Sequence, residues 1–231
     1  MIISGLEKFS LLDYPGKISA VLFTFGCNLN CPFCHNPELK LGNWNDMSVY
    51  TTDEIYQFMK NKVGKLDALT ITGGEPTIHE DLLDFIKKIK SLGFLIKLDT
   101  NGVNCEKVEK IMKEKVVDYW AMDIKGDLKI YNKCGFQLKS LNNIERSVDL
   151  IRNCGVDYEF RTTVLKSWHT KSVIEKIGKM LKGVNKYYIQ NFRSGKTLDM
   201  SLTNSDSFTH NELLNMKKEL QKYITKVEIR D

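Results

Sequence analysis

The strongest constraint on the fold is a repeated alternation between short apolar segments and amphipathic ones. The first apolar segment, residues 18–25 (ISAVLFTF), is almost continuously apolar and rich in β-branched and aromatic side chains. That composition is typical of a strand that is buried on both faces. Five further segments share this character. The predicted strands cover residues 18–25, 67–72, 94–100, 116–124, 156–164 and 186–192.

Helix-like segments separate these strands. Residues 80–91 repeat apolar side chains at helical spacing, and residues 52–62 open with Thr-Asp-Glu, a helix N-terminal signal. Gly93 and Gly155 stand where a helix ends in the left-handed conformation. The predicted helices cover residues 52–62, 80–91, 106–115, 140–153, 170–181 and 209–223.

Strands that alternate with helices predict a parallel sheet with right-handed crossovers. An open doubly wound sheet and an incomplete (β/α) barrel both satisfy this pattern. In either architecture the active site lies at the carboxyl ends of the strands. Because the sequence has no internal repeat, low-complexity tract or Pro/Gly/Ser-rich linker, we expect one domain over residues 1–231.

Composition and charge exclude several classes of protein. The chain has 42% apolar and 27% charged residues, which is ordinary for a globular protein and excludes disorder. No apolar run approaches the ~18 residues of a membrane span. The start, MIISGLEKFS, lacks the pattern of a secretory signal. We therefore expect a cytoplasmic protein with no membrane partner.

The net charge of +5 is unevenly distributed. Residues 161–200 carry nine basic and two acidic side chains. Such a stretch could meet nucleic acid, an acidic protein or a phosphorylated ligand. The spacing of Lys171, Lys176, Lys179 and Lys182 is also that of a solvated helix face, which needs no partner. We prefer the solvated face and expect no nucleic-acid partner.

Three of the six cysteines stand in one short loop after the first predicted strand, as Cys27, Cys31 and Cys34. Three thiolates in one loop can bind a soft metal or an iron–sulfur cluster. A structural zinc site needs four ligands, and His35 is poorly placed to complete one. On a four-iron cluster, three thiolates leave one iron free for a ligand. The isolated Cys105, Cys134 and Cys154 are expected to fill buried space as small hydrophobes.

The C-x3-C-x2-C spacing, with aromatic Phe33 before the last cysteine, resembles the defining motif of the radical S-adenosylmethionine superfamily. The resemblance implies a [4Fe–4S] cluster on Cys27, Cys31 and Cys34. It implies that the amino and carboxylate groups of S-adenosylmethionine chelate the open iron. One electron then cleaves the sulfonium to methionine and a 5′-deoxyadenosyl radical.

Further motifs follow later predicted strands. The segment 72–76 (TGGEP) is by itself only a strand-to-helix turn that lets the backbone approach a ligand. The resemblance implies that Gly73, Gly74 and Glu75 cradle the methionine amino group.

Segments 99–102 (DTNG) and 122–125 (MDIK) place two carboxylates at strand ends, where they would repel unless a cation lay between them. They resemble stretches of pyruvate formate-lyase activating enzyme. That resemblance implies that a monovalent cation is bound by Asp99, Thr100, Asp123 and the Met122 carbonyl. It also implies that Lys125 binds the carboxylate of the cofactor. The simpler interpretation is a turn at Asn101-Gly102 with Asp99 as a helix cap.

Two more polar side chains lie near strand ends. Arg161 lies near the end of a predicted buried strand, where a guanidinium needs an anionic partner. In the superfamily, an arginine at this place lies near the cofactor. Gln190 is expected to contact the adenosine part of S-adenosylmethionine. The alternative is that Gln190 is only an outward-facing polar residue. The side chains that the resemblance places at the cofactor are Phe33, Gly73, Gly74, Glu75, Asp99, Asn101, Asp123, Lys125, Arg161 and Gln190.

The segment 9–16 (FSLLDYPG) and the ending Cys34-His35-Asn36 resemble anaerobic ribonucleoside-triphosphate reductase activating proteins. Tyr14 departs from the Asp-Gly-Pro-Gly of other glycyl-radical activating enzymes. The resemblance implies abstraction of a glycine Cα hydrogen in a partner glycyl-radical enzyme, with anaerobic ribonucleotide reductase expected. It also implies a low-potential electron donor such as flavodoxin or ferredoxin.

A partner loop must reach the cofactor, which favours an incomplete (β/α)6 barrel with parallel strands and the cofactor at their carboxyl ends. Two alternatives remain at this point. One is a radical S-adenosylmethionine enzyme that acts on a small molecule or nucleoside. The other is a non-catalytic zinc-binding module whose basic face recruits nucleic acid.

Overall fold

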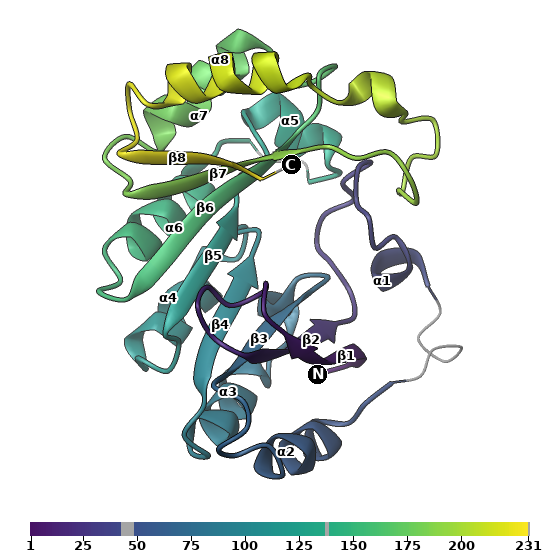
Figure 1. The fold of residues 1–231 in the computed structure, drawn as a ribbon, viewed down its shortest axis with the longest axis vertical. Coiled ribbons are helices and arrows are strands. Elements are labelled where there is room, and N and C mark those ends of the chain that lie inside the picture. Colours follow the sequence, from purple (N-terminus) through teal and green to yellow (C-terminus); the bar gives the residue numbers. More distant parts are fainter. Residues whose placement is uncertain (43–48, 137–138, 231) are drawn as a thin grey trace. The chain divides into compact units, whose positions relative to one another are not determined.

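The computed structural model describes residues 1–42, 49–136 and 139–230 (Figure 1). The chain divides into two compact units. The first comprises Met1–Asn28, Glu38–Thr100 and Glu106–Ala121, and the second comprises Leu29–Pro37, Asn101–Cys105 and Met122–Asp231. Within the described residues, no helix combines the length and the apolar character that crossing a membrane requires.

Parallel strands form the centre of the first unit. The strands are β1 (Ile3–Ser10), β2 (Ser19–Thr24), β3 (Ala68–Gly73) and β4 (Leu95–Thr100). β2, β3 and β4 are parallel, with Leu69 paired to Ala20 on one side and to Ile96 on the other. β1 is antiparallel to β2. Asp118, just before β5 (Tyr119–Asp123), donates its N–H to Ile96 O at 2.8 Å, so β5 follows β4.

The helices of this part of the chain bury apolar side chains. They are α1 (Glu38–Leu41), α2 (Thr52–Lys60), α3 (Leu82–Lys90) and α4 (Cys105–Lys113), with the 3-10 turn η2 (Pro76–Ile78). α2 begins in a capping box, in which Thr51 Oγ1 accepts the Glu54 N–H and Glu54 Oε2 accepts the Thr51 N–H. α3 buries Leu82, Phe85 and Ile89.

The second unit repeats the pattern. Its strands are β6 (Asp157–Val164), β7 (Lys186–Asn191) and β8 (Lys226–Arg230), all parallel. The N–H of Ile124 donates to Arg161 O at 2.9 Å, which joins the end of β5 to β6. The helices are α5 (Leu128–Lys133), α6 (Asn142–Arg152), α7 (Lys171–Met180) and α8 (His210–Leu220), with η3 (Asn204–Asp206). Figure 1 shows α7 and α8 side by side along β7 and β8.

The six predicted strands are confirmed as β2 to β7, and the α/β class with parallel strands is confirmed with them. Gly93 and Gly155 adopt the left-handed conformation, with φ of +93° and +77°. The lysines of α7 are exposed, as predicted for a solvated face. The sequence analysis did not predict β1, β8, α1 or α5. β1 and β8 escaped it because several of their side chains are half-buried or exposed.

Candidate functional site

The second unit contains two of the three loop cysteines in one turn. The N–H of Cys34 donates to Cys31 O at 2.9 Å. Backbone bonds hold this turn from two sides. Asn30 N–H donates to Cys134 O at 2.7 Å, and Asp199 N–H donates to Pro32 O at 2.8 Å. Phe33 is buried and meets the Trp168 ring edge-on, with 5.7 Å between centroids. The turn is therefore fixed by the main chain and by one aromatic anchor.

The Cys31 thiol is buried and hydrogen-bonded to Cys134. That hydrogen bond and burial raise the pKa of Cys31 well above its usual value, while the nearby Lys125 ammonium acts in the opposite direction. Cys31 is therefore a thiol at neutral pH and must lose its proton to bind a metal.

A compact ion cluster lies beside this cysteine. Lys125 Nζ donates to Asp123 Oδ2 at 3.0 Å, and Arg161 Nε donates to Asp123 Oδ1. Burial works against the Asp123 charge, but Arg161 and Lys125 outweigh it and hold the pKa of this carboxyl well below its usual range. The Lys125 ammonium also lies 5.9 Å from the Phe33 ring centroid. Arg161 also lies 3.8 Å from Glu159, which pairs with Arg230. Three cations against two carboxylates leave a positive excess that can take an anionic group of a ligand.

The backbone of Lys125 is held on both sides by residues that the sequence analysis did not single out. Its N–H donates to Tyr131 Oη at 3.3 Å, and its carbonyl lies 3.0 Å from His169 Nε2. Since His169 Nδ1 accepts the Leu165 N–H at 2.9 Å, the ring proton is on Nε2 and donates to Lys125 O. His169 is separated from Lys125 in sequence, so no local motif points to it.

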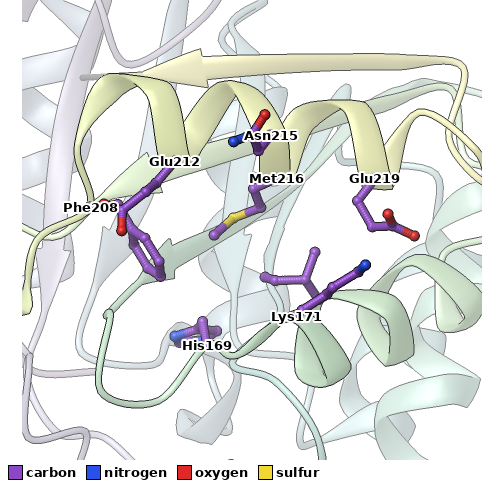
Figure 2. Close-up of a pocket in the computed structure, with 8 residues that line it drawn as sticks. His169, Lys171, Phe208, Glu212, Asn215, Met216 and Glu219 are labelled. Atoms are coloured by element: carbon purple, nitrogen blue, oxygen red, sulfur yellow. The ribbon is translucent and has the colours of Figure 1, made fainter.

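His169 also lines a cavity of about 320 Å³ between α7 and α8. Figure 2 shows Phe208 and Met216 extending from the α8 side toward His169. Glu212 belongs to the α8 capping box and also pairs with Lys166 at 2.7 Å. Both ring nitrogens of His169 are engaged with the backbone, so the residue that lines this cavity also fixes the Lys125 carbonyl.

Gln190 lines a second cavity, of about 540 Å³, near the carboxyl ends of β6 and β7. His35, Arg193, Lys196 and Arg230 line it too, and none of the described residues that line it is acidic. This cavity suits a polar or anionic group. Arg161 lies instead in the ion cluster described above.

Asn101 forms a turn, as the simpler interpretation of the DTNG segment proposed. Its Oδ1 accepts the Val103 N–H at 3.0 Å, and Gly102 has φ of +73°. The Met122 side chain covers the space where a Gly102 Cβ would lie. Asn101 and Met122 are therefore engaged in packing and turn formation within the second unit.

In the first unit, the paired glycines pack against the backbone that leads into Cys27. A Cβ on Gly74 would lie 1.9 Å from Gly26 O, and one on Gly73, whose φ is +112°, would lie 2.4 Å from Thr24 N. Gly74 N–H donates to Thr24 O at 2.9 Å, and Glu75 N–H donates to Gly26 O at 2.8 Å. The glycines are required because two stretches of main chain are in direct contact.

The Glu75 carboxylate is an internal hydrogen-bond acceptor. Its Oε1 accepts from Thr77 N–H at 3.1 Å, from Thr77 Oγ1 at 2.6 Å and from Thr100 Oγ1 at 2.7 Å. The residue is 1% exposed. In this structure its side chain ties together the ends of β3 and β4.

Both strand-end aspartates have cationic partners within their own units. Asp99 pairs with the buried Lys97 and accepts from Thr72 Oγ1 at 3.1 Å, and Asp123 has Lys125 and Arg161. The repulsion that suggested a monovalent cation is therefore already offset by side chains. The cation site on Asp99, Thr100, Asp123 and Met122 stays a prediction.

The cysteine loop has the chemistry that the [4Fe–4S] cluster of the resemblance needs. Thiolates are the ligands of such clusters, and the Lys125 ammonium favours a thiolate at Cys31. Within residues 1–42, 49–136 and 139–230, no three His, Cys, Asp or Glu side chains are arranged as a metal site. The Cys31 thiol is instead engaged with Cys134. The donor set fits the cluster, and binding requires the Cys31 proton to leave.

Comparison with known proteins identifies the family. The model of the radical SAM superfamily matches residues 21–177. A Methanocaldococcus jannaschii protein described as a glycyl-radical enzyme activating enzyme is 36% identical, over 99% of this chain and 95% of that protein. A pyruvate formate-lyase-activating enzyme of Clostridium pasteurianum is 28% identical, over 79% of this chain and 76% of its own length.

Solved structures show the same fold. SuiB of Streptococcus suis bound to S-adenosylmethionine matches 91% of this chain with a TM-score of 0.70 at 14% identity, and the chain spans 50% of SuiB. A domain of a pyruvate formate-lyase-activating enzyme from Bacteroides vulgatus matches 71% of this chain, and 99% of that domain is covered, with a TM-score of 0.54 at 19% identity. These matches agree with the expected incomplete barrel, and the superfamily implies a [4Fe–4S] cluster and S-adenosylmethionine. The chain belongs to the radical SAM superfamily and, within it, to the glycyl-radical enzyme activating enzymes.

Proposed function

We propose that this enzyme activates anaerobic ribonucleoside-triphosphate reductase by removing a Cα hydrogen from a glycine of that partner. The proposal assigns Cys27, Cys31 and Cys34 as ligands of the [4Fe–4S] cluster. With S-adenosylmethionine bound, such a cluster supplies one-electron cleavage of the sulfonium. Glycine is the reasonable target because two flanking amides stabilise its Cα radical and no side chain blocks access.

The observation that carries the cofactor chemistry of the proposal is the Lys125 ammonium beside Cys31, while the choice of partner rests on the resemblance of segment 9–16. The Lys125 side chain is 14% exposed, shares Asp123 with Arg161, and interacts electrostatically with Cys31. A buried cation next to a cluster ligand is suited to hold the carboxylate of the cofactor's methionine part. Tyr131 and His169 fix the Lys125 backbone, so the side chain starts from a defined point.

Other side chains have supporting roles in the proposal. Gln190, in the cavity at the ends of β6 and β7, is assigned to the adenosine part. Phe33 packs beside Lys125 and shields the cysteine turn. The remaining residues assigned to the cofactor are Gly73, Gly74, Glu75, Asp99, Asn101 and Asp123. A low-potential donor such as flavodoxin or ferredoxin supplies the electron, in the cytoplasm, where thiols stay reduced.

The first experiment tests the chemistry without a partner. The protein is reconstituted with iron and sulfide under anaerobic conditions, and 5′-deoxyadenosine is measured after dithionite and S-adenosylmethionine are added. We expect Cys31→Ala to abolish the product and Cys105→Ala, a buried cysteine outside the loop, to retain it. Zinc binding with refusal of iron would contradict the proposal.

The second experiment tests Lys125 directly. Binding of S-adenosylmethionine to the reconstituted enzyme is measured by calorimetry for Lys125→Met and for Lys133→Met, an exposed lysine on α5. We expect at least a tenfold weaker Kd for Lys125→Met at unchanged iron content, and no change for Lys133→Met. Equal affinity in both variants would remove the role assigned to Lys125.

The partner is tested by electron paramagnetic resonance. The reconstituted enzyme is mixed with anaerobic ribonucleotide reductase or with pyruvate formate-lyase, and the glycyl radical doublet is recorded. We expect the doublet with the reductase and its loss when the target glycine of the reductase is replaced by alanine. A doublet that appears only with pyruvate formate-lyase would support the glycyl-radical activity but would contradict the assignment of the reductase as partner.

A further inference from the structure

Cys134 lies directly against the cysteine loop. It is the C-cap residue of α5, it is 0% exposed, and its carbonyl accepts the Asn30 N–H at 2.7 Å. Its thiol is hydrogen-bonded to the Cys31 thiol. The next residue, Gly135, has φ of +80°, and a Cβ there would lie 3.0 Å from Asn30 Cβ. The end of α5 can approach the loop this closely because residue 135 is glycine.

The main-chain bond from Asn30 N–H to Cys134 O holds the end of α5 beside the loop, and it does not involve the Cys31 side chain. In the thiol form, either sulfur can donate its proton to the other. A Cys31 sulfur bound to iron has no proton left, so it can only accept. The donor of the pair must then be the S–H of Cys134.

Cys134 is poorly suited to be a ligand of the same cluster. Thiolates on different irons of a four-iron cube point away from one another, whereas the sulfurs of Cys31 and Cys134 are hydrogen-bonded neighbours. The loop of Cys27, Cys31 and Cys34 already offers three thiolates, and this is the number that leaves one iron open for the cofactor.

We propose that Cys134 is a positioning and tuning residue that donates a hydrogen bond to the Cys31 sulfur when that sulfur ligates iron. A donor to a ligating sulfur stabilises the added negative charge of the reduced cluster more than the charge of the oxidised one. Cys134 thereby raises the reduction potential of the cluster and eases electron delivery from the donor. This inference rests on the proposed assignment of Cys31 as a cluster ligand, and it does not depend on which partner protein the enzyme activates.

The test is a redox titration of the reconstituted enzyme, monitored by electron paramagnetic resonance. We expect Cys134→Ala to make the midpoint potential more negative, with a roughly tenfold change in the reduction equilibrium, or about 59 mV for one electron. Cys134→Ser keeps a donor of similar size and is expected to stay near the wild-type potential. Cys105→Ala removes another buried thiol, outside the loop, and is expected to leave the potential unchanged.

A spectroscopic measurement distinguishes donation from a general packing effect. Electron–nuclear double resonance of the reduced cluster, reconstituted in D2O, should show a coupled exchangeable deuteron that is missing in Cys134→Ala and present in Cys134→Ser. An unchanged potential and an unchanged deuteron signal in Cys134→Ala would overturn the proposal. If Cys134→Ala fails to hold iron, the Cys134→Ser variant distinguishes a hydrogen-bond donor from a cluster ligand. A serine variant with normal iron and the deuteron coupling supports donation, and one that also loses the cluster indicates a ligand and overturns it.

Discussion

Thr100 Oγ1 donates to Glu75 Oε1 at 2.7 Å, a hydrogen bond that joins residues beyond β3 to the last residue of β4. The same oxygen accepts two hydrogen bonds from Thr77. A single buried carboxylate oxygen therefore fixes the positions of two neighbouring strand ends. The segment that begins with the paired glycines depends on this acceptor for its shape.

Replacing Glu75 by alanine should destabilise the fold, because three donors would lose a buried acceptor. We expect a loss of about 2–4 kcal/mol in the free energy of unfolding for Glu75→Ala. Glu75→Gln keeps an oxygen at the same place and should recover most of the loss. Urea unfolding of the two variants and the parent measures this. Similar losses in the two variants would mean that charge, and not hydrogen bonding, is the contribution of Glu75.

Replacing Gly74 by alanine tests the close approach of the two backbones. Its Cβ would lie 1.9 Å from Gly26 O, whereas a Cβ on Gly5 of β1 would meet Phe23 at an ordinary 3.5 Å. We expect Gly74→Ala to lose about 3 kcal/mol or more and Gly5→Ala to change stability by less than about 1 kcal/mol. Thermal unfolding and iron content after reconstitution are the measurements. Normal iron uptake and stability in Gly74→Ala would show that the segment can move apart.

His169 should make stability depend on pH below neutrality. Burial lowers the pKa of His169, and its backbone hydrogen bonds only partly oppose this. The folded state therefore binds this proton less readily than the unfolded state, whose histidine pKa is about 6.5. The stabilising contribution is complete above that pH and is lost as the pH falls below it.

We expect His169→Gln to flatten the decline in unfolding free energy between about pH 6.5 and pH 5. His210→Gln, at an exposed histidine, serves as the control for the substitution itself. His79, whose pKa burial also lowers, is present in every variant and cancels in the comparison. Parallel curves for the parent and His169→Gln would exclude this source of the pH dependence.

The pair Arg230–Glu159 should be important for β8. Arg230 Nη1 and Nη2 donate to the two Glu159 oxygens at 2.9 Å each, and Glu159 is 1% exposed. We expect Arg230→Ala to cost about 2–3 kcal/mol, since it removes two charge-assisted hydrogen bonds from a buried carboxylate. The double variant with Glu159→Gln should be more stable than Arg230→Ala alone. Chemical unfolding of the three variants checks the order.

The sequence predicted the fold wherever burial on both faces left a continuous apolar run. β2 and β3 are such strands, and both were predicted. β1 and β8 were not, because most of their side chains are half-buried or exposed and follow no clear period. α5 has only six residues, and its start depends on the Asp127 side chain, which accepts the Ile130 N–H. Short or half-exposed elements give too weak a pattern to recognise.

The sequence predicted the cysteine loop and the strand-end motifs, but it did not reveal their internal partners. Lys97 and Asp99 are two residues apart, which places them on one face of β4, so that pairing could have been predicted. The contact of Cys134 with Cys31 could not, because it depends on how the end of α5 meets a loop far away in the sequence. Side chains joined only by tertiary packing leave no local signal.

The backbone bonds from Gly74 and Glu75 to residues 24 and 26 have an evolutionary consequence. They are made by main-chain atoms, so the half-buried side chain at Phe25 can change without disturbing them, whereas Thr24 is buried and its hydroxyl donates to Thr72 O at 3.1 Å. The number of residues between β2 and Cys27, in contrast, cannot change. Inserting or deleting one residue there would move both acceptors out of register, so we expect homologous sequences to vary in residue type at position 25 and to keep the same length.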